Sequence, residues 1–130
     1  MIKTYGLTHI ALAVSDLKRT LQFYKEIFGA VPMYQEETWA QVQTPGSHDI
    51  IVFEERPLIA GKKSGGIQHF GFRLIDTVSI PEIKEKLQQL QAEILDSGEF
   101  VPGEPYIFFL DPDGYEIEVW YEKPLGHPFL

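Results

Sequence analysis

Hydrophobic and polar positions along the chain follow first a strand-like and then a helix-like spacing. The run at residues 7–14 (LTHIALAV) is short, apolar and bounded by turn formers, which predicts a largely buried strand. Ser15 or Asp16 then offers an N-cap for a helix that ends at Gly29. Apolar residues recur at helical spacing within it, at Leu17, Leu21, Tyr24 and Phe28. The chain is therefore expected to open with one strand and one amphipathic helix.

The same order of elements then continues and restarts. Three short strand candidates follow the helix, at residues 31–34, 38–43 and 49–53. The polar segment 55–66, rich in Gly and Pro, predicts a connector. Beyond it come a strand, a helix and three further strands, at residues 67–74, 80–91, 93–95, 106–110 and 115–121. The last two strands are joined by the turn sequence DPDG.

The chain thus repeats one strand–helix–strand–strand–strand unit. Its period is about 60 residues, since His9 and His69 open the two halves and 69 − 9 = 60. In HIALAVSD and HFGFRLID, the histidine stands seven residues before an aspartate. This duplication predicts an α+β fold of two tandem βαβββ modules. Module one covers about 5–54, a linker 55–66, module two about 67–122 and a tail 123–130, all within one domain.

Composition narrows the class of protein. A chain of 130 residues with 44% hydrophobic and 23% charged residues has the size and core of one ordinary domain. No apolar run is long enough to span a membrane, and the N-terminus lacks a signal-peptide pattern, so a cytoplasmic protein without a membrane partner is expected. The absence of cysteine leaves only nitrogen and oxygen groups for chemistry. The net charge of −8 disfavours nucleic acid as a partner.

Two histidines share a strand face with small residues. His9 alternates with Ala11 and Ala13, while the bulky aliphatic residues of its strand point the other way. His69 alternates in the same manner with Gly71 and Arg73. The helices are expected to cover the bulky faces, which leaves the two histidines at equivalent positions on the sparse side.

The final strand adds carboxylates. Glu116, Glu118 and Trp120 occupy one of its faces, opposite Ile117 and Val119. A carboxylate on the inner face of a sheet is costly unless it is paired or bound to a metal ion. Two imidazoles and one carboxylate form a three-ligand site that suits Fe(II), Mn(II), Ni(II), Co(II) or Zn(II). The alternative is that the histidines are hydrogen-bonded core residues and that the carboxylate lies at a sheet edge.

Several segments carry a resemblance to a known family. LTHIALAVSDL, FYKEIFGA, IQHFGFRL and FFLDPDGYEIEVWYE resemble the vicinal oxygen chelate superfamily over roughly residues 5–122. That superfamily includes glyoxalases, fosfomycin-resistance thiol transferases, methylmalonyl-CoA epimerases, extradiol dioxygenases and bleomycin-resistance proteins. The resemblance implies two βαβββ modules in a curved mixed sheet around a metal cleft, with helices on the outer face, and a homodimer. By motif it makes His9, His69 and Glu118 the metal ligands, and Glu116 a polar group of the cleft.

Departures from the family pattern bear on the reaction. Glyoxalases use a fourth ligand on the fourth strand, where Val52 stands here, with Glu54 two residues on and on the same face. Unless Glu54 substitutes, the site has three protein ligands, and glyoxalase or epimerase chemistry is disfavoured. Ring-cleaving dioxygenases resemble the chain but place a tyrosine where Phe108 stands, and Tyr106 lies two residues earlier on the same face. A second histidine of that family is also missing, since Glu54 falls at about its place.

Thiol transferases need cations around a phosphonate. The candidates are Arg73, Arg56 and Lys62, and the net charge of −8 argues against an anionic substrate. The expected function is a metal-dependent enzyme acting on a small molecule chelated through oxygens, with Glu118, Tyr106 and Arg73 as catalytic candidates. The alternative is a non-catalytic binding protein of the bleomycin-resistance kind that sequesters an aromatic or cationic ligand.

The remaining polar and aromatic residues carry weaker expectations. Trp39, Gln41 and Gln43 either line a cleft or form an exposed sheet face. His48 and His127 are expected to be solvent-exposed, and the tail with Pro124, Pro128 and Phe129 to pack on a partner subunit.

Overall fold

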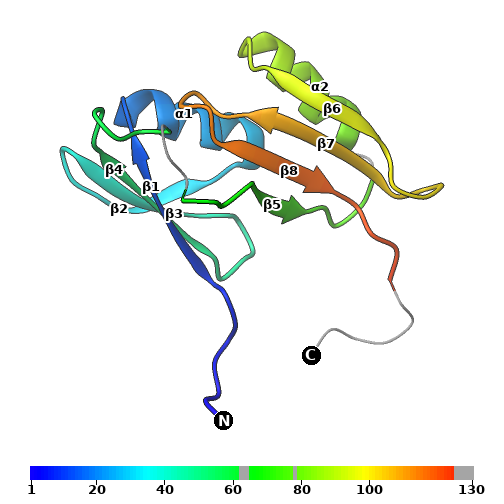
Figure 1. The fold of residues 1–130 in the computed structure, drawn as a ribbon, viewed down its shortest axis with the longest axis horizontal. Coiled ribbons are helices and arrows are strands. Elements are labelled where there is room, and N and C mark those ends of the chain that lie inside the picture. The colour runs from blue at the N-terminus through cyan, green and yellow to red at the C-terminus, as the bar shows by residue number, and fades with distance from the viewer. Residues whose placement is uncertain (62–64, 78, 125–130) are drawn as a thin grey trace. The chain divides into compact units, whose positions relative to one another are not determined.

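The computed structural model describes residues 1–61, 65–77 and 79–124. Lys62, His127, Pro128 and Phe129 therefore lie outside the described residues. The chain divides into two compact units, Met1–Lys63 (unit 1) and Ser64–Leu130 (unit 2). Each unit contains one helix and one four-stranded sheet, so the expected α+β fold of two tandem βαβββ modules is confirmed (Figure 1).

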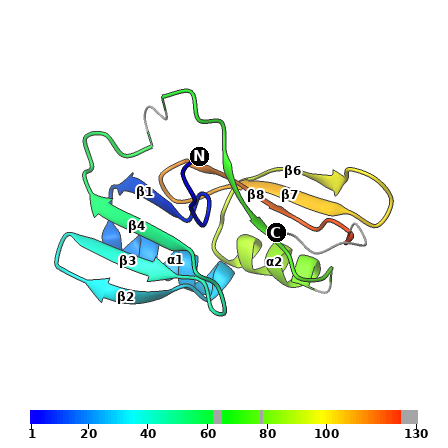
Figure 2. The same cartoon turned by 90° about the horizontal axis from the view of Figure 1, so that it is seen from below.

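Unit 1 is built from five elements. They are β1 (His9–Val14), α1 (Leu17–Phe28), β2 (Val31–Gln35), β3 (Trp39–Gln43) and β4 (Ile50–Glu55). The strand order is β1-β4-β3-β2, which can be followed in Figure 2. β1 and β4 run parallel, and the other neighbours run antiparallel, so the sheet is mixed.

Unit 2 repeats this arrangement. Its elements are β5 (Phe70–Arg73), α2 (Ser79–Gln89), β6 (Ile94–Glu99), β7 (Pro105–Leu110) and β8 (Glu116–Trp120). The order β5-β8-β7-β6 is that of unit 1, again with one parallel pair, β5 and β8. Each position in one sheet therefore has a counterpart in the other.

The ends of α1 are fixed by specific backbone partners. Asp16 is the N-cap, and its carboxylate accepts a hydrogen bond from the Arg19 N–H at 3.1 Å. The Glu55 carboxylate at the end of β4 accepts a second one from the Leu17 N–H at 3.0 Å. Gly29 ends the helix in the left-handed region, at φ 68°, where glycine carries no Cβ penalty.

The helices cover the bulky face of each sheet. In unit 1, α1 buries Leu17, Thr20, Phe23, Tyr24 and Ile27, and the Tyr24 ring centroid lies 4.8 Å from that of Phe53. Leu21 and Phe28, expected on the buried stripe, are half-buried because the stripe runs through Phe23 and Ile27 instead. In unit 2, α2 buries Ile83 and Leu87 and lies along one face of the sheet in both views (Figures 1 and 2). The sheet residues buried in unit 2 are Ile107, Phe109, Ile117 and Val119.

Some strand boundaries differ from those expected. Leu7 and Ile67 are 98% and 62% exposed, and the strands begin only at His9 and Phe70, where pairing with β4 and β8 begins. β6 extends beyond the expected residue 95 to Glu99 because its polar residues pair with β7. No helix among the described residues is long and apolar enough to cross a membrane.

Candidate metal site

The face of each sheet opposite its helix carries the histidines, and we call it the histidine face. In unit 2, Gly71 pairs with Glu118 across β5 and β8. Phe70 pairs with Ile117, so His69, one residue earlier, lies beside Glu116. Because Ile117 is fully buried on the helix side, Glu116 and Glu118 project from the histidine face with His69.

His69 is held by two neighbours on this face. Its Nδ1 lies 3.5 Å from the Glu116 Oε2, and both side chains are 35% exposed. Its ring lies edge-on to Phe108, with centroids 5.2 Å apart and an interplanar angle of 81°. Phe108 pairs with Glu118 across β7 and β8, so the imidazole reaches over β8 on the side of Glu118. In the described part of the chain, no hydrogen bond or ion pair engages the His69 Nε2.

Glu118 is half-buried between aromatic side chains. Phe108 is its cross-strand neighbour on β7. On the other side the Trp120 ring lies over Gly71, so close that a Cβ at Gly71 would come within 2.9 Å of the Trp120 Cζ3. Among the described residues, no side chain forms a hydrogen bond or ion pair with the Glu118 carboxylate. Its oxygens are therefore available as ligands.

In unit 1, the residue paired with His9 on the neighbouring strand is not a carboxylate. His9 is exposed and pairs with Ile50, and the next residue pair on this face joins Ala11 and Val52. By register, His9 corresponds to His69, Ile50 to Glu116 and Val52 to Glu118.

Glu54 is placed away from His9. It pairs with Ala13, four residues along β1, which corresponds to a separation of about 13 Å along the strand. One ion cannot bridge side chains that far apart, so within unit 1 the position of Glu54 disfavours it as a further ligand of an ion bound by His9.

Tyr106 and Arg73 are engaged in contacts of their own. The Tyr106 O–H donates a hydrogen bond to the Asp96 carboxylate at 3.0 Å, and its ring stacks on Phe100 with centroids 4.2 Å apart. The hydrogen bond to Asp96, and secondarily burial and the charge of Asp96, raise the pKa of Tyr106 above its ordinary value. A tyrosine with a raised pKa is less able to act as a base at neutral pH.

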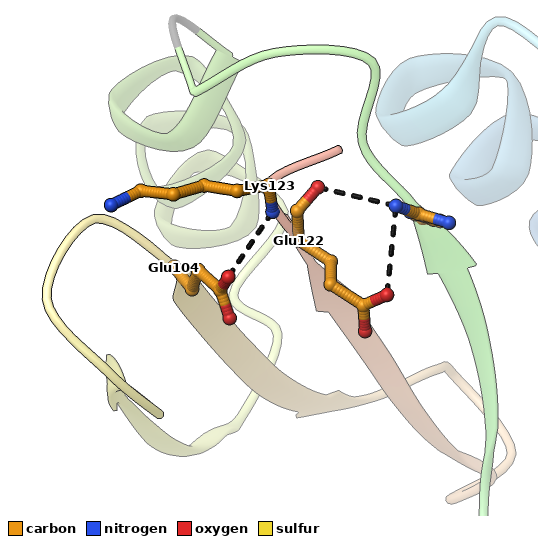
Figure 3. A network of polar contacts seen from close by, with 4 residues as sticks. Glu104, Glu122 and Lys123 are labelled. Carbon is orange, nitrogen blue, oxygen red and sulfur yellow. Dashed lines mark hydrogen bonds and ion pairs between the residues drawn. The ribbon is translucent and has the colours of Figure 1, made fainter. Parts of the chain in front are cut away.

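Arg73 is tied to the end of β8. Its Nη2 donates to the Glu122 carbonyl at 3.2 Å and lies 3.6 Å from the Glu122 Oε2. In the same network the Lys123 backbone N–H donates to the Glu104 carboxylate at 3.2 Å (Figure 3). The Arg73 charge is thus partly neutralised by a carboxylate.

The other residues considered in the sequence analysis lie in ordinary structural positions. Trp39 is half-buried, and its ring contacts Tyr34 with centroids 5.0 Å apart. His48 is exposed in its turn. Asp111 is buried and accepts hydrogen bonds from the N–H groups of Asp113 and Tyr115, a structural role in the DPDG turn. Sequence reasoning missed the contacts of His69 with Glu116 and of Tyr106 with Asp96, because both depend on strand register.

The donor atoms fit a divalent metal ion. His69 Nε2 and the Glu118 carboxylate lack partners among the described residues, and the second nitrogen of His69 faces a carboxylate, as is usual for a metal-binding histidine. Within each unit taken alone, the described residues contain no cluster of three or more His, Asp or Glu side chains that could hold a metal. His9 belongs to unit 1, and His69 and Glu118 belong to unit 2.

Known proteins resemble the chain over most of its length. A metallothiol transferase FosB from Staphylococcus epidermidis is 30% identical over 115 residues, covering 88% of this chain and 80% of that protein. A catechol-2,3-dioxygenase from Bacillus subtilis is 25% identical over 123 residues, covering 90% of this chain but 42% of that protein. The fosfomycin resistance protein FosX from Listeria monocytogenes superimposes with a TM-score of 0.76 at 26% identity, covering 95% and 96% of the two chains.

A point mutant of this FosX has also been solved with Mn(II) and 1S,2S-dihydroxypropylphosphonic acid. The family model for the Glyoxalase/Bleomycin resistance protein/Dioxygenase superfamily matches residues 6–119. The chain belongs to the glyoxalase/bleomycin resistance protein/dioxygenase superfamily.

Proposed function

We propose that the protein is a metal-dependent enzyme in which His9, His69 and Glu118 hold a divalent ion and a small substrate is chelated through two oxygens. The observation that carries the proposal is the register of the two sheets, which gives each unit a histidine at the same position. Two residues beyond the histidine, the paired strand of unit 2 adds the carboxylate of Glu118, whereas Val52 stands at the counterpart in unit 1. This ligand set leaves coordination positions for substrate and water.

A bound divalent ion would supply Lewis-acid stabilisation of negative charge that develops on the substrate. The protein supplies the surroundings of the chelated oxygens. Phe108 and Trp120 flank Glu118 and present apolar surface to the carbon skeleton of the substrate. Glu116 and Glu118 are carboxylates of this face beside His69, and Tyr106 keeps its proton because its O–H bonds to Asp96.

These surroundings favour a planar, uncharged diol over a phosphonate. Arg73, a cation at the end of β5, is already paired with Glu122. The net charge of −8 also disfavours an anionic substrate. A catechol-type substrate is therefore the first to test, by oxygen consumption with iron-loaded protein. Metal-dependent loss of thiol in the presence of fosfomycin tests the transferase reaction suggested by the metallothiol transferase FosB, with the antibiotic suggested by the fosfomycin resistance protein FosX.

Metal analysis tests the ligand set directly. Protein purified without chelator is expected to contain about one divalent ion per chain, and His69→Ala and Glu118→Ala should lose it. The matched control is His48→Ala, which removes an exposed turn histidine and should retain the metal. Equal metal content in the wild type, His69→Ala and Glu118→Ala would overturn the proposal.

A binding protein of the bleomycin-resistance kind is the second candidate. The contact of Tyr34 with Trp39, together with the acidic net charge, favours an aromatic or cationic ligand. Such a protein needs no metal. Binding of a cationic aromatic dye that survives EDTA would favour this candidate, and loss of binding on EDTA treatment would reject it.

The assembly we propose is a homodimer. β2 is an edge strand that exposes Val31, Met33 and Tyr34 at 48%, 56% and 52%. An exposed apolar edge strand is usually covered by another element or chain. Sedimentation analysis should give twice the mass of one chain, and a monomer at micromolar concentration would contradict the assembly.

A further inference from the structure

The two histidines differ in what lies beside them. The His69 Nδ1 is 3.5 Å from the Glu116 Oε2, whereas His9 pairs with Ile50, whose side chain carries no hydrogen-bond acceptor. We propose that Glu116 is a positioning residue that keeps the proton of His69 on Nδ1 and so leaves the lone pair of Nε2 for a ligand. This inference rests on the proposed metal-binding function of His69.

The geometry supports this role for Glu116 in three ways. First, the contact with Glu116 involves the ring nitrogen next to Cγ, so the nitrogen that reaches farthest from the strand is the one left without a partner among the described residues. Second, the Phe108 ring stands edge-on to the imidazole at 81°, which limits rotation of the ring away from Glu116. Third, both Glu116 and His69 are 35% exposed, so their contact is only partly screened by solvent.

The register of β5 and β8 fixes the position of Glu116 relative to His69. Phe70 pairs with Ile117, and this places His69 and Glu116 side by side on the histidine face. Glu118 lies two residues further along the same face and pairs with Gly71. The two carboxylates of β8 therefore have different roles: Glu118 binds the metal ion, and Glu116 orients the metal ligand His69. A carboxylate partner of this kind also raises the basicity of the coordinating nitrogen.

Nuclear magnetic resonance of metal-free protein gives a readout that does not depend on metal or activity. Long-range ¹H–¹⁵N spectra distinguish the two tautomers of each neutral imidazole, recorded at a pH where His69 is uncharged. We expect the Nδ1–H tautomer for His69 in the wild type and a shift toward Nε2–H in Glu116→Ala. Glu116→Gln keeps an acceptor oxygen and should largely retain the wild-type tautomer.

Two variants serve as matched controls. Glu93→Ala removes an exposed carboxylate of unit 2 and tests the effect of charge alone, so the tautomer of His69 should stay unchanged. Ile50→Glu introduces a carboxylate at the counterpart of Glu116 and should move His9 toward the Nδ1–H tautomer. Isothermal titration with Mn(II) should show affinity weakened about tenfold to a hundredfold in Glu116→Ala, and much less in Glu116→Gln.

The possible outcomes separate this inference from the proposed function. An unchanged tautomer of His69 in Glu116→Ala overturns the positioning role even if the wild type binds metal. If the tautomer shifts but the wild type binds no divalent ion, the positioning stands and the metal-binding function fails. A shift of equal size in Glu93→Ala would show that general charge, and not the contact with Glu116, controls the tautomer.

Discussion

Val52 and Glu118 occupy the same position in the two sheets. Val52 pairs with Ala11 beside β1, and Glu118 pairs with Gly71 beside β5, each two residues beyond the histidine of its own unit. The two units thus share one framework and differ in the side chain at this point. The three-ligand character of the proposed site follows from this single difference between the units.

Replacing Val52 with glutamate tests that difference. Val52→Glu places a carboxylate at the counterpart of Glu118, and this fourth ligand, the second anionic one, should tighten binding of Mn(II) or Ni(II) about tenfold, or about 1.4 kcal/mol. Val52→Gln has nearly the same volume without the charge and is the control. Titration calorimetry measures both. Tightening by Val52→Gln as strong as by Val52→Glu would show that packing, not a new ligand, is responsible.

Gly71 provides the space in which the Trp120 ring lies beside Glu118. A Cβ at this position would meet the Trp120 Cζ3 at 2.9 Å and the Glu118 carbonyl oxygen at 3.0 Å. Gly71→Ala should therefore displace Trp120 and lower the free energy of unfolding by about 1–3 kcal/mol. Urea denaturation measures the loss, and tryptophan fluorescence in a Trp39→Phe background reports on Trp120. The loss should be smaller when Trp120→Ala is already present, and equal losses in both backgrounds would contradict the contact.

The sequence predicts which residues share a face better than it predicts which of them touch. Period-two alternation places His9, Ala11 and Ala13 opposite Leu12 and Val14, and burial in the structure agrees. Alternation cannot say where a strand starts, because that depends on its partner. Leu7 has strand character but lies one residue before the point where Thr8 accepts the hydrogen bond from the Ile50 N–H.

Side-chain contacts between neighbouring strands could not be predicted from the sequence, because they depend on the register of the strands. The meeting of His69 with Glu116 requires the parallel register in which Phe70 faces Ile117, and no local pattern specifies that register. The bond from Tyr106 to Asp96 depends in addition on a register shift between Ile94 and Asp96. A duplicated sequence can predict equivalent positions, but the different neighbours of these positions become visible only in the folded chain.

The ionisation of Tyr106 should depend on Asp96. The hydrogen bond to Asp96 raises the pKa of Tyr106 above its ordinary value, so Asp96→Ala should lower this pKa toward about 10. The folded state holds the Tyr106 proton more tightly than the unfolded state does. The hydrogen bond therefore stabilises the fold below pH about 10, and this stabilisation is lost as the pH rises through the pKa of Tyr106 in the folded state. Titration of ¹³Cζ-labelled tyrosine follows each residue. Tyr34, whose pKa is raised mainly by its hydrogen bond to Glu36, is the internal control and should not respond.

Two adjacent glutamates of β4 should differ in their effect on stability. The Glu55 carboxylate accepts a hydrogen bond from the Leu17 N–H at 3.0 Å, at the positive end of α1, whereas Glu54 is exposed on the histidine face. Glu55→Ala should lower the free energy of unfolding by about 1 kcal/mol, because an N–H group of the first helical turn loses its acceptor.

Glu54→Ala is the control for this comparison, since it makes the same change of side chain on the same strand without touching α1. It should leave the free energy of unfolding within about 0.5 kcal/mol of the wild type. Urea denaturation followed by circular dichroism measures both variants. Addition of salt should narrow the gap between them, because part of the Glu55 effect is the attraction between a carboxylate and a helix N-terminus. If the two variants are destabilised equally, the hydrogen bond to Leu17 does not stabilise the fold, and the beginning of α1 depends on Asp16 alone.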